Sequence, residues 1–214
     1  MKRTGVLWVL LFLVSSCITV NVASQSQQPT NTPTPTVSGT TLLDLIEQAP
    51  NARWGNFVAG TVLPFPGNDN DIRGFALYRF NATMENGNTY PKLLETHPQW
   101  VDNGGIMGWY GPITINNGCR FIANVGFLNA PGSCTDGVEF RVNFKESVAD
   151  TDTLLIDVPH KYNGILVPIN TSLESIAGKT GYLQLIVLTA GNSCGDWATW
   201  TDAKVIQGGS LGDL

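Results

Sequence analysis

Two stretches of alternating hydrophobic and polar residues lie near the middle of the chain. Residues 138–145 alternate Val, Phe, Val and Phe with Glu, Arg, Asn and Lys, and residues 120–127 place Phe, Ala, Val and Phe at every second position. A period of two puts one side of a strand in a core and the other toward solvent, as in antiparallel sheets. Residues 129–137 between them are mostly turn formers. We therefore predict an antiparallel hairpin whose strands are joined by a long loop.

Shorter runs with the character of strands follow one another through the rest of the globular region. They cover residues 71–80, 92–96, 113–115, 153–158, 165–169, 181–189 and 197–205. Turn signals at a spacing of roughly 8–12 residues are typical of β-sandwiches. The Gly-rich residues 100–109 are interpreted as a loop, and residues 172–178 as one helical turn. The pattern predicts an all-β, jelly-roll-like antiparallel β-sandwich.

One short helix is expected before the first strand. Thr41 and Asp44 have the spacing of a capping box, and Leu42, Leu45 and Ile46 follow at helical intervals before Pro50. We predict a helix over residues 42–48 that covers an edge or an end of the sandwich.

The start of the chain has the pattern of an export signal. Lys2 and Arg3 precede an apolar run, residues 6–14, that is too short to span a membrane comfortably. Residues 13–17 end in Cys17 and resemble a bacterial lipobox, which predicts that Cys17 is lipidated and anchors the protein at the cell surface. The alternative is ordinary cleavage near residues 22–24, which would give a secreted protein.

These signals divide the chain into four parts. A lipoprotein-type signal peptide covers residues 1–17, a Pro- and Thr-rich tether residues 18–40, the sandwich residues 41–207, and a Gly-rich tail residues 208–214. A Pro-rich segment without core residues is an extended spacer. The net charge of -5 and the low share of charged residues, 14%, lack the basic footprint of a nucleic-acid-binding protein.

Export permits disulfide bonds among the three remaining cysteines. Cys119 starts a predicted strand at one end of the sandwich, whereas Cys134 lies in the loop at the other end. Three later reversals of the chain return it to that second end around Cys194. We therefore predict a disulfide between Cys134 and Cys194, with Cys119 free. The three cysteines lack the spacing of a zinc site, and we expect no metal or cofactor.

Several side chains with chemical potential have plainer interpretations. Residues 68–74 begin like a calcium loop, but Arg73 and Phe80 occupy ligand positions, so an Asx-rich turn is favoured. A Ser-His-acid set needs a positioned nucleophile, and we interpret His97 as a structural histidine bonded to backbone, with less to suggest a role for His160.

Glycoside hydrolysis needs two carboxyl groups facing each other at about 5 Å or about 6.5–9.5 Å. The sequence singles out no such pair among its scattered carboxylates, which are Glu85, Glu95, Asp102, Asp136, Glu139, Asp196 and Asp202. We expect no enzymatic activity, and a hydrolase with an unrecognised pair remains the alternative.

Aromatic residues in or near Gly- and Asn-rich stretches are the best candidates for a binding site. Trp109 and Tyr110 lie among glycines, with Asn103 and Asp102 a few residues earlier. Aromatic rings can pack against the apolar face of a sugar, and Asn and Asp can bond its hydroxyl groups. We predict a carbohydrate site at these four residues. Core packing is the alternative for each ring, and we favour it for Trp197 and Trp200.

Two parts of the chain resemble known proteins. Residues 194–205, Cys-Gly-Asp-Trp-Ala-Thr-Trp-Thr-Asp-Ala-Lys-Val, resemble the Asp-Trp-Ala-Asp-Ala end strand of NPCBM carbohydrate-binding modules, with residues 199–201 as an insertion. Those modules are jelly-roll sandwiches attached to bacterial glycosidases. Residues 94–100 and 125–127 resemble segments of uncharacterised surface proteins of filamentous bacteria such as the Chloroflexota. Neither resemblance transfers a binding residue.

Together these observations favour a lipid-anchored surface protein whose sandwich binds a glycan without turning it over. A structural or protein-binding surface domain without a sugar site is the first alternative, and the hydrolase is the second. In each case the expected location is outside the cytoplasm, with membrane contact through the lipid alone.

Overall fold

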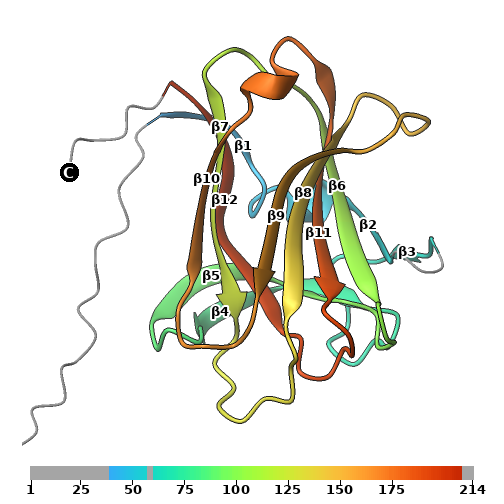
Figure 1. Ribbon diagram of the computed structural model, residues 1–214, viewed down its shortest axis with the longest axis vertical. Coiled ribbons are helices and arrows are strands. Elements are labelled where there is room, and N and C mark those ends of the chain that lie inside the picture. Colours follow the sequence, from blue (N-terminus) through green and yellow to red (C-terminus); the bar gives the residue numbers. More distant parts are fainter. Residues whose placement is uncertain (1–38, 57–59, 209–214) are drawn as a thin grey trace, which may run out of the picture. The chain divides into compact units, whose positions relative to one another are not determined.

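The computed structural model describes residues 39–56 and 60–208, which form two antiparallel sheets packed face to face, so the predicted β-sandwich is confirmed (Figure 1). Sheet I has the order β10 (Val167–Ser172), β7 (Cys119–Phe127), β12 (Ala198–Gln207), β5 (Thr89–His97) and β4 (Phe75–Thr83), with β1 (Thr40–Asp44) paired to β12. Sheet II has the order β3 (Val62–Leu63), β2 (Arg53–Asn56), β6 (Gly105–Thr114), β11 (Thr180–Thr189), β8 (Val138–Lys145) and β9 (Thr153–His160). The predicted signal peptide, Cys17 and nearly all of the tether lie outside the described residues.

The predicted hairpin is wrong, although both of its strands exist. β7 pairs with β10 and β12 in sheet I, whereas β8 pairs with β11 and β9 in sheet II. The loop between β7 and β8 therefore crosses from one layer to the other (Figure 1). Alternation tells which side of a strand is buried but not which strand lies beside it. A loop this long can span the roughly 10 Å between packed sheets.

The predicted helix over residues 42–48 is also wrong. Residues 40–44 form β1, which takes its backbone partners from β12, and a 3-10 helix, η1 (Ala49–Asn51), follows after a turn. The expected polar contact exists, since the Glu47 amide donates to Asp44 Oδ1 at 3.0 Å, but it closes the turn. The helical turn predicted over residues 172–178 is confirmed as a second 3-10 helix, η2 (Glu174–Ile176).

The Gly-rich stretch interpreted as a loop, residues 100–109, contains half of a strand. β6 begins at Gly105, and Gly108 faces the buried ring of Trp54 across the pair with β2. A Cβ at Gly108 would lie 2.7 Å from that ring, so glycine is required here for packing. No helix in the described part of the chain has the length and apolar character needed to cross a membrane.

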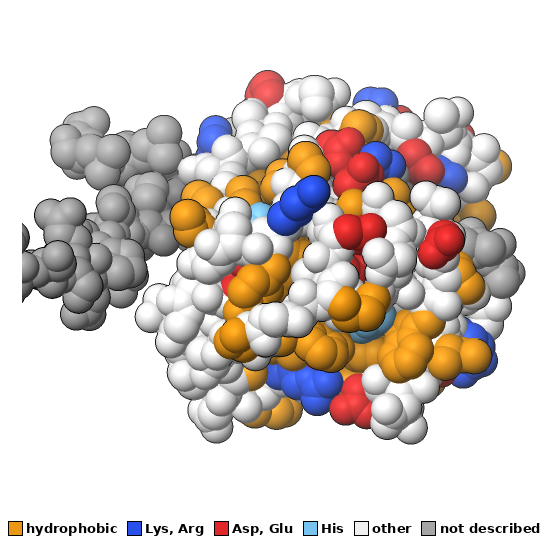
Figure 2. All heavy atoms as spheres, turned by 60° about the horizontal axis from the view of Figure 1, so that its bottom comes forward, with side chains coloured by type: hydrophobic (Ala, Val, Ile, Leu, Met, Phe, Trp, Pro, Cys, Tyr) orange, Lys and Arg blue, Asp and Glu red, His pale blue; other side chains and the backbone are white. Residues whose placement is uncertain are grey.

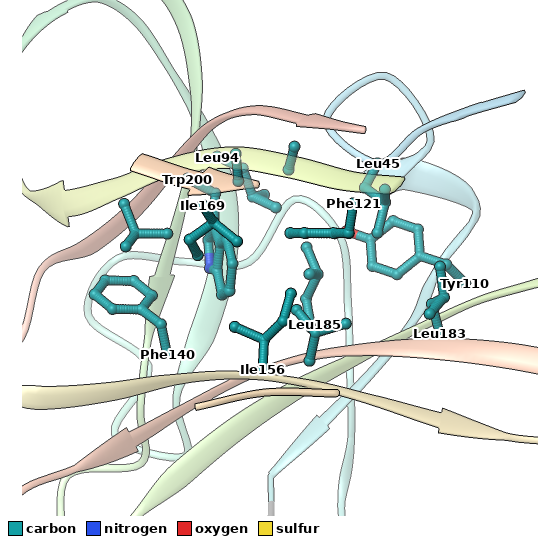
Figure 3. Close-up of a cluster of buried hydrophobic side chains, with 14 of the residues drawn as sticks. Leu45, Leu94, Tyr110, Phe121, Phe140, Ile156, Ile169, Leu183, Leu185 and Trp200 are labelled. Atoms are coloured by element: carbon teal, nitrogen blue, oxygen red, sulfur yellow. The ribbon is translucent and has the colours of Figure 1, made fainter. Parts of the chain in front are cut away.

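The core lies between the two sheets and takes side chains from both (Figure 3). Phe121 of β7 and Leu94 of β5 face Leu185 of β11 and Phe140 of β8. Trp200 is 0% exposed and packs edge-on against Phe140 with ring centroids 5.1 Å apart, which confirms its expected burial. The expectation that Trp197 lies in the core is wrong, because Trp197 is 38% exposed and precedes β12 on the side opposite the buried Ala198.

The predicted disulfide is present. Cys134 in the β7–β8 loop is bonded to Cys194 in the β11–β12 loop, with the two Cα atoms 5.5 Å apart. Cys119 is unpaired and fully buried at the opposite end of β7. The bond ties together two of the loops that connect the sheets at one end of the sandwich.

Candidate functional site

The structure separates the four residues predicted to form a sugar site. Trp109 stands half-buried on the outer face of sheet II, because its neighbours Gly108 and Tyr110 point into the sandwich. Tyr110 is 2% exposed and packs edge-on against Trp54 at 6.0 Å between ring centroids. Figure 3 shows its ring among Leu45, Phe121 and Leu183. Burial places the pKa of Tyr110 well above its ordinary value. Its ring is therefore part of the core and offers no face to a ligand.

Asp102 and Asn103 are exposed in the loop that precedes β6. The backbone amide of Asn103 donates to the carbonyl of Gly191 at 2.9 Å, which joins this loop to the β11–β12 loop. At about 3.3 Å per strand residue, Trp109 lies roughly 15–20 Å away. One sugar ring cannot contact Trp109 and this loop together.

The surroundings of Trp109 include two residues that the sequence did not single out. The ring of Tyr182 from β11 lies 6.0 Å from the Trp109 ring, inclined by 60°. Lys145 Nζ, from β8, lies 5.6 Å from the centre of the Trp109 ring and 3.3 Å from Asp152. Three strands thus converge on the Trp109 ring and fix its orientation.

Polar side chains continue the row beside Trp109 across sheet II. Gln184 of β11 pairs in register with Trp109 on one side and with Asn143 of β8 on the other. Gln184 is 1% exposed and Asn143 is 8% exposed, and the side-chain oxygen of each lacks a hydrogen-bond partner among the described residues. A buried amide oxygen without a partner costs free energy, so these two acceptors need an explanation.

The surface beside this row is hollowed to a volume of about 450 Å³. The hollow is lined by Trp109 and Tyr182, by Met107 from β6, by Arg53 from β2 and by Val148 from the β8–β9 loop. We call this the Trp109 hollow. Its volume lies within the range of roughly 300–1,000 Å³ that is usual for small-molecule sites. No Asp or Glu lines it among residues 39–56 and 60–208.

The plainer interpretations of His97 and the Asx-rich segment are confirmed. His97 is 2% exposed, and its Nδ1 lies 2.8 Å from the backbone oxygen of Pro98. The backbone amide of Asn70 donates to Asn68 Oδ1 at 2.9 Å, and the backbone amide of Arg73 donates to Asp71 Oδ1 at 3.0 Å. Within the described residues, no three His, Cys, Asp or Glu side chains gather closely enough to hold a metal ion.

His160 has a larger role than its sequence context suggested. Its Nε2 lies 2.7 Å from Glu85 Oε1, and both side chains are buried. Glu85 also accepts hydrogen bonds from the backbone amides of Phe127, Asn163 and Gly164 at 2.8–3.0 Å. Burial alone would raise the pKa of Glu85, but these donors outweigh it and lower the pKa. The pair joins the β4–β5 and β9–β10 loops to the ends of β7 and β9 and has a structural function.

Among the remaining carboxylates, several are held by cations or loop donors. Glu95 is paired with Arg79, Glu139 with Arg141, and Asp202 with Lys204. Asp196 is fully buried, and burial raises its pKa to about 7 against the opposing hydrogen bond from Thr135 Oγ1 at 2.5 Å. The Asp136 carboxylate accepts from the backbone amide of Asn192 at 3.2 Å.

The residues that sequence reasoning missed belong to other strands of the same sheet. Tyr182 and Gln184 come from β11 and Lys145 comes from β8, and each of the three residues lies 36 or more positions from Trp109 in the sequence. Each has the phase of an outward-facing residue in its own strand, which was the available signal. The order of strands in the sheet, which brings them beside Trp109, has no local sequence signature.

No protein-family model matches the chain, and no curated protein matches its sequence. Among solved structures, a carbohydrate-binding module from the β-sandwich superfamily aligns with 79% of this chain and 63% of its own, at 9% identity and a TM-score of 0.51. The CBM51-2 and INT domains of Clostridium perfringens ZmpB align with 61% of this chain and 28% of theirs, at 16% identity and a TM-score of 0.42. The CBM22-1 xylan-binding domain of Paenibacillus barcinonensis Xyn10C aligns with 80% and 97%, at 12% identity and a TM-score of 0.46. At these identities the first of these similarities shows the fold, a β-sandwich of the kind found in carbohydrate-binding modules.

Proposed function

We propose that this sandwich is a non-catalytic carbohydrate-binding module and that the Trp109 hollow receives the glycan. The observation that carries the proposal is the fixed Trp109 ring in a hollow of about 450 Å³, beside a second aromatic residue, Tyr182. The carbohydrate-binding module with a TM-score of 0.51 has the same fold. We extend its binding property to this chain as part of the proposal.

The aromatic pair supplies the apolar part of the site. Trp109 and Tyr182 meet at 60°, so their faces form two walls instead of one flat surface. Trp and Tyr present large apolar areas and lose little conformational freedom on binding, since each has only two side-chain torsions. A pyranose ring resting on Trp109 would replace water on both surfaces.

The polar part of the site matches the hydroxyl groups of a sugar. Arg53 at the rim of the hollow can donate hydrogen bonds. Gln184 and Asn143 in the neighbouring strands offer side-chain oxygens that have no partner among the described residues. Hydroxyl groups both donate and accept, so a sugar in the hollow can accept from Arg53 and can donate to acceptors in this part of the sheet.

The lining of the hollow favours binding over hydrolysis. Hydrolysis of a glycosidic bond needs two facing carboxyl groups, and no Asp or Glu lies among the described residues of the lining. A structural or protein-binding domain is the remaining alternative. A hollow that holds an aromatic pair and polar rim groups fits a small, hydroxylated ligand better than a flat protein surface.

We propose further that the sandwich is a jelly roll displayed by a lipid anchor outside the cytoplasm. The successive strands β5, β6, β7 and β8 alternate between the two sheets, which is the connectivity that supports a jelly roll. The sequence before residue 41 supports the anchor, with a lipobox at Cys17 and a Pro-rich tether. The disulfide fits an oxidising compartment. Palmitate labelling in a bacterial host should be lost in Cys17→Ala, and labelling of that variant would contradict the anchor.

Screening on a glycan array followed by calorimetry of the strongest ligand tests the binding function. We expect a dissociation constant on the order of 0.1–1 mM, near -4 to -5.5 kcal/mol. Trp109→Ala should remove most of the binding. Phe80→Ala is the matched control, since it removes an aromatic side chain that is 64% exposed on β4 of the other sheet, and it should bind like the parent.

A further inference from the structure

A second hollow lies on the outer face of sheet I. It has a volume of about 410 Å³ and is lined by Trp197, Arg79, Asp69, Asn70 and by residues 128–130 of the β7–β8 loop. We call the hollow that these residues line the Trp197 hollow. Figure 2 looks onto the loop-bearing end of the sandwich and shows hydrophobic side chains gathered across it, with acidic and basic side chains beside them.

Sheet I and its loops fix the aromatic residue of this hollow. Trp197 precedes β12 and projects to the same side as Thr199, away from the core. The Leu128 amide donates to the Trp197 carbonyl at 3.0 Å, so the backbone on both sides of the hollow is joined. The side chain remains 38% exposed, and an exposed Trp in a polar hollow offers one face to a ligand.

Arg79 forms the polar wall and is held from two sides. Its Nε donates to Glu95 Oε2, and its two terminal nitrogens lie 3.4 Å from Asp69 Oδ2. Glu95 is 0% exposed, and its second oxygen has no partner in the described part of the chain. A guanidinium anchored by its Nε keeps its terminal donors in a fixed direction. The contacts with Asp69 Oδ2 are long, so a ligand oxygen can take the place of Asp69 as the acceptor without any movement of the guanidinium.

Further donors and acceptors stand around the same hollow. Asn129 Oδ1 accepts from the Tyr162 hydroxyl at 3.0 Å, which orients the amide and leaves its NH₂ group for a ligand. Asp69 is 49% exposed at its side chain and offers carboxylate oxygens. A donor pair and an acceptor on opposite sides of an aromatic face are what neighbouring hydroxyl groups of a sugar require.

The charges of the hollow decide which sugars it can take. Among the described residues that line it, the one cation is Arg79, which faces two carboxyl groups, those of Glu95 and Asp69. Burial raises the pKa of Glu95, and its pairing with Arg79 opposes that effect. This lining therefore has no surplus positive charge to attract a carboxylate or sulfate group.

We infer that the Trp197 hollow is a second carbohydrate site and that it takes an uncharged pyranose unit. This inference rests on the proposed function, but it concerns a different site. Trp197 and Arg79 lie on the outer face of sheet I, whereas Trp109 lies on the outer face of sheet II. Both sheets therefore separate the two sites, and one module can hold two glycan ends at once.

The test follows the indole N–H signals of ¹⁵N-labelled protein during titration with methyl glycosides. Trp109→Phe and Trp197→Phe assign the two signals. The probes are methyl β-D-galactopyranoside and methyl β-D-xylopyranoside as neutral sugars and sodium glucuronate as the charged control, each up to about 50 mM, above the weak millimolar range expected for a single sugar. We expect the Trp197 signal to move with at least one neutral probe and to stay in place with glucuronate.

Two variants at exposed positions test one polar and one aromatic contact of the Trp197 hollow. Asp69→Asn should weaken the response to the neutral probe at least threefold, and Trp197→Ala should abolish the shifts of nearby amides. A Trp197 signal that no neutral probe moves overturns the inference, and so does a larger shift with glucuronate. If only Trp109 responds, the proposed function stands and the second site falls. If only Trp197 responds, the second site stands and the Trp109 site falls.

Discussion

Replacing Glu85 by Gln should lower the free energy of unfolding of the sandwich more than a Glu→Gln change at its surface does. Glu85 accepts four hydrogen bonds, one from His160 and three from backbone amides. Its side chain is 0% exposed, and a carboxylate can only accept, so all four groups donate to it. Gln keeps one oxygen but turns an NH₂ group toward two donors, and it removes the charge that strengthens every bond.

The magnitude follows from the hydrogen bonds that the substitution breaks. Hydrogen bonds to a charged group are worth about 1.5–3 kcal/mol each. Two donors lose their acceptor in Glu85→Gln, so the free energy of unfolding should fall by about 3–6 kcal/mol. The lowered pKa of Glu85 also fixes the pH dependence. Its stabilising effect is present above the ordinary pKa of a Glu and is lost as the pH falls through the folded-state value.

Urea unfolding at pH 7, followed by Trp fluorescence, measures the effect. Glu139→Gln is the matched control, because Glu139 pairs with Arg141 at a side-chain exposure of 35%. Exposed ion pairs contribute little, so the control should lose less than about 1 kcal/mol. If Glu85→Gln lost no more than Glu139→Gln, the reasoning about the buried pair would be refuted.

Three more measurements concern stability. Reducing the Cys134–Cys194 bond, which closes a loop with a sequence separation of 60, should lower the unfolding free energy by about 4 kcal/mol, and an unchanged urea midpoint would contradict this. Asp196 holds its proton more tightly when folded, so stability should fall by about 2 kcal/mol from pH 4 to pH 7, after allowance for screening. Asp196→Asn should flatten that slope, and an unchanged slope counts against it. Gly108→Ala should lower the melting temperature, because the added Cβ would lie 2.7 Å from the Trp54 ring, and an unchanged melting temperature would contradict this.

How far the sequence predicts this fold depends on whether a feature is local. Alternation along β7 and β8 located both strands, because the period of buried residues is a property of each strand. It could not reveal that β7 and β8 belong to different sheets, because partner choice depends on the long loop and on β11 and β12. The segment before β2 shows the same limit, since β12 offers residues 40–44 backbone partners that outweigh their helical spacing.

The same distinction applies to the site. Trp109 was found because it is an aromatic residue among glycines, but Tyr110 beside it points into the core, and only the phase of β6 decides which of the two faces out. The glycines that suggested an open loop include Gly108, which is required by the Trp54 ring. Trp197 is exposed because it comes one residue before β12, whose first residue, Ala198, is buried, and the sequence does not show where that strand begins.

Calorimetric titration of the strongest array ligand into the parent, Trp109→Ala and Phe80→Ala tests the central claim most directly, with a melting curve for each protein. The account predicts that Trp109→Ala loses at least tenfold in affinity, or about 1.4 kcal/mol. Its melting temperature should stay close to that of the parent, since Trp109 lies on the outer face of sheet II. Phe80→Ala should keep the parent affinity. A Trp109→Ala protein that is strongly destabilised yet binds with the parent affinity would make Trp109 a packing residue and contradict the claim.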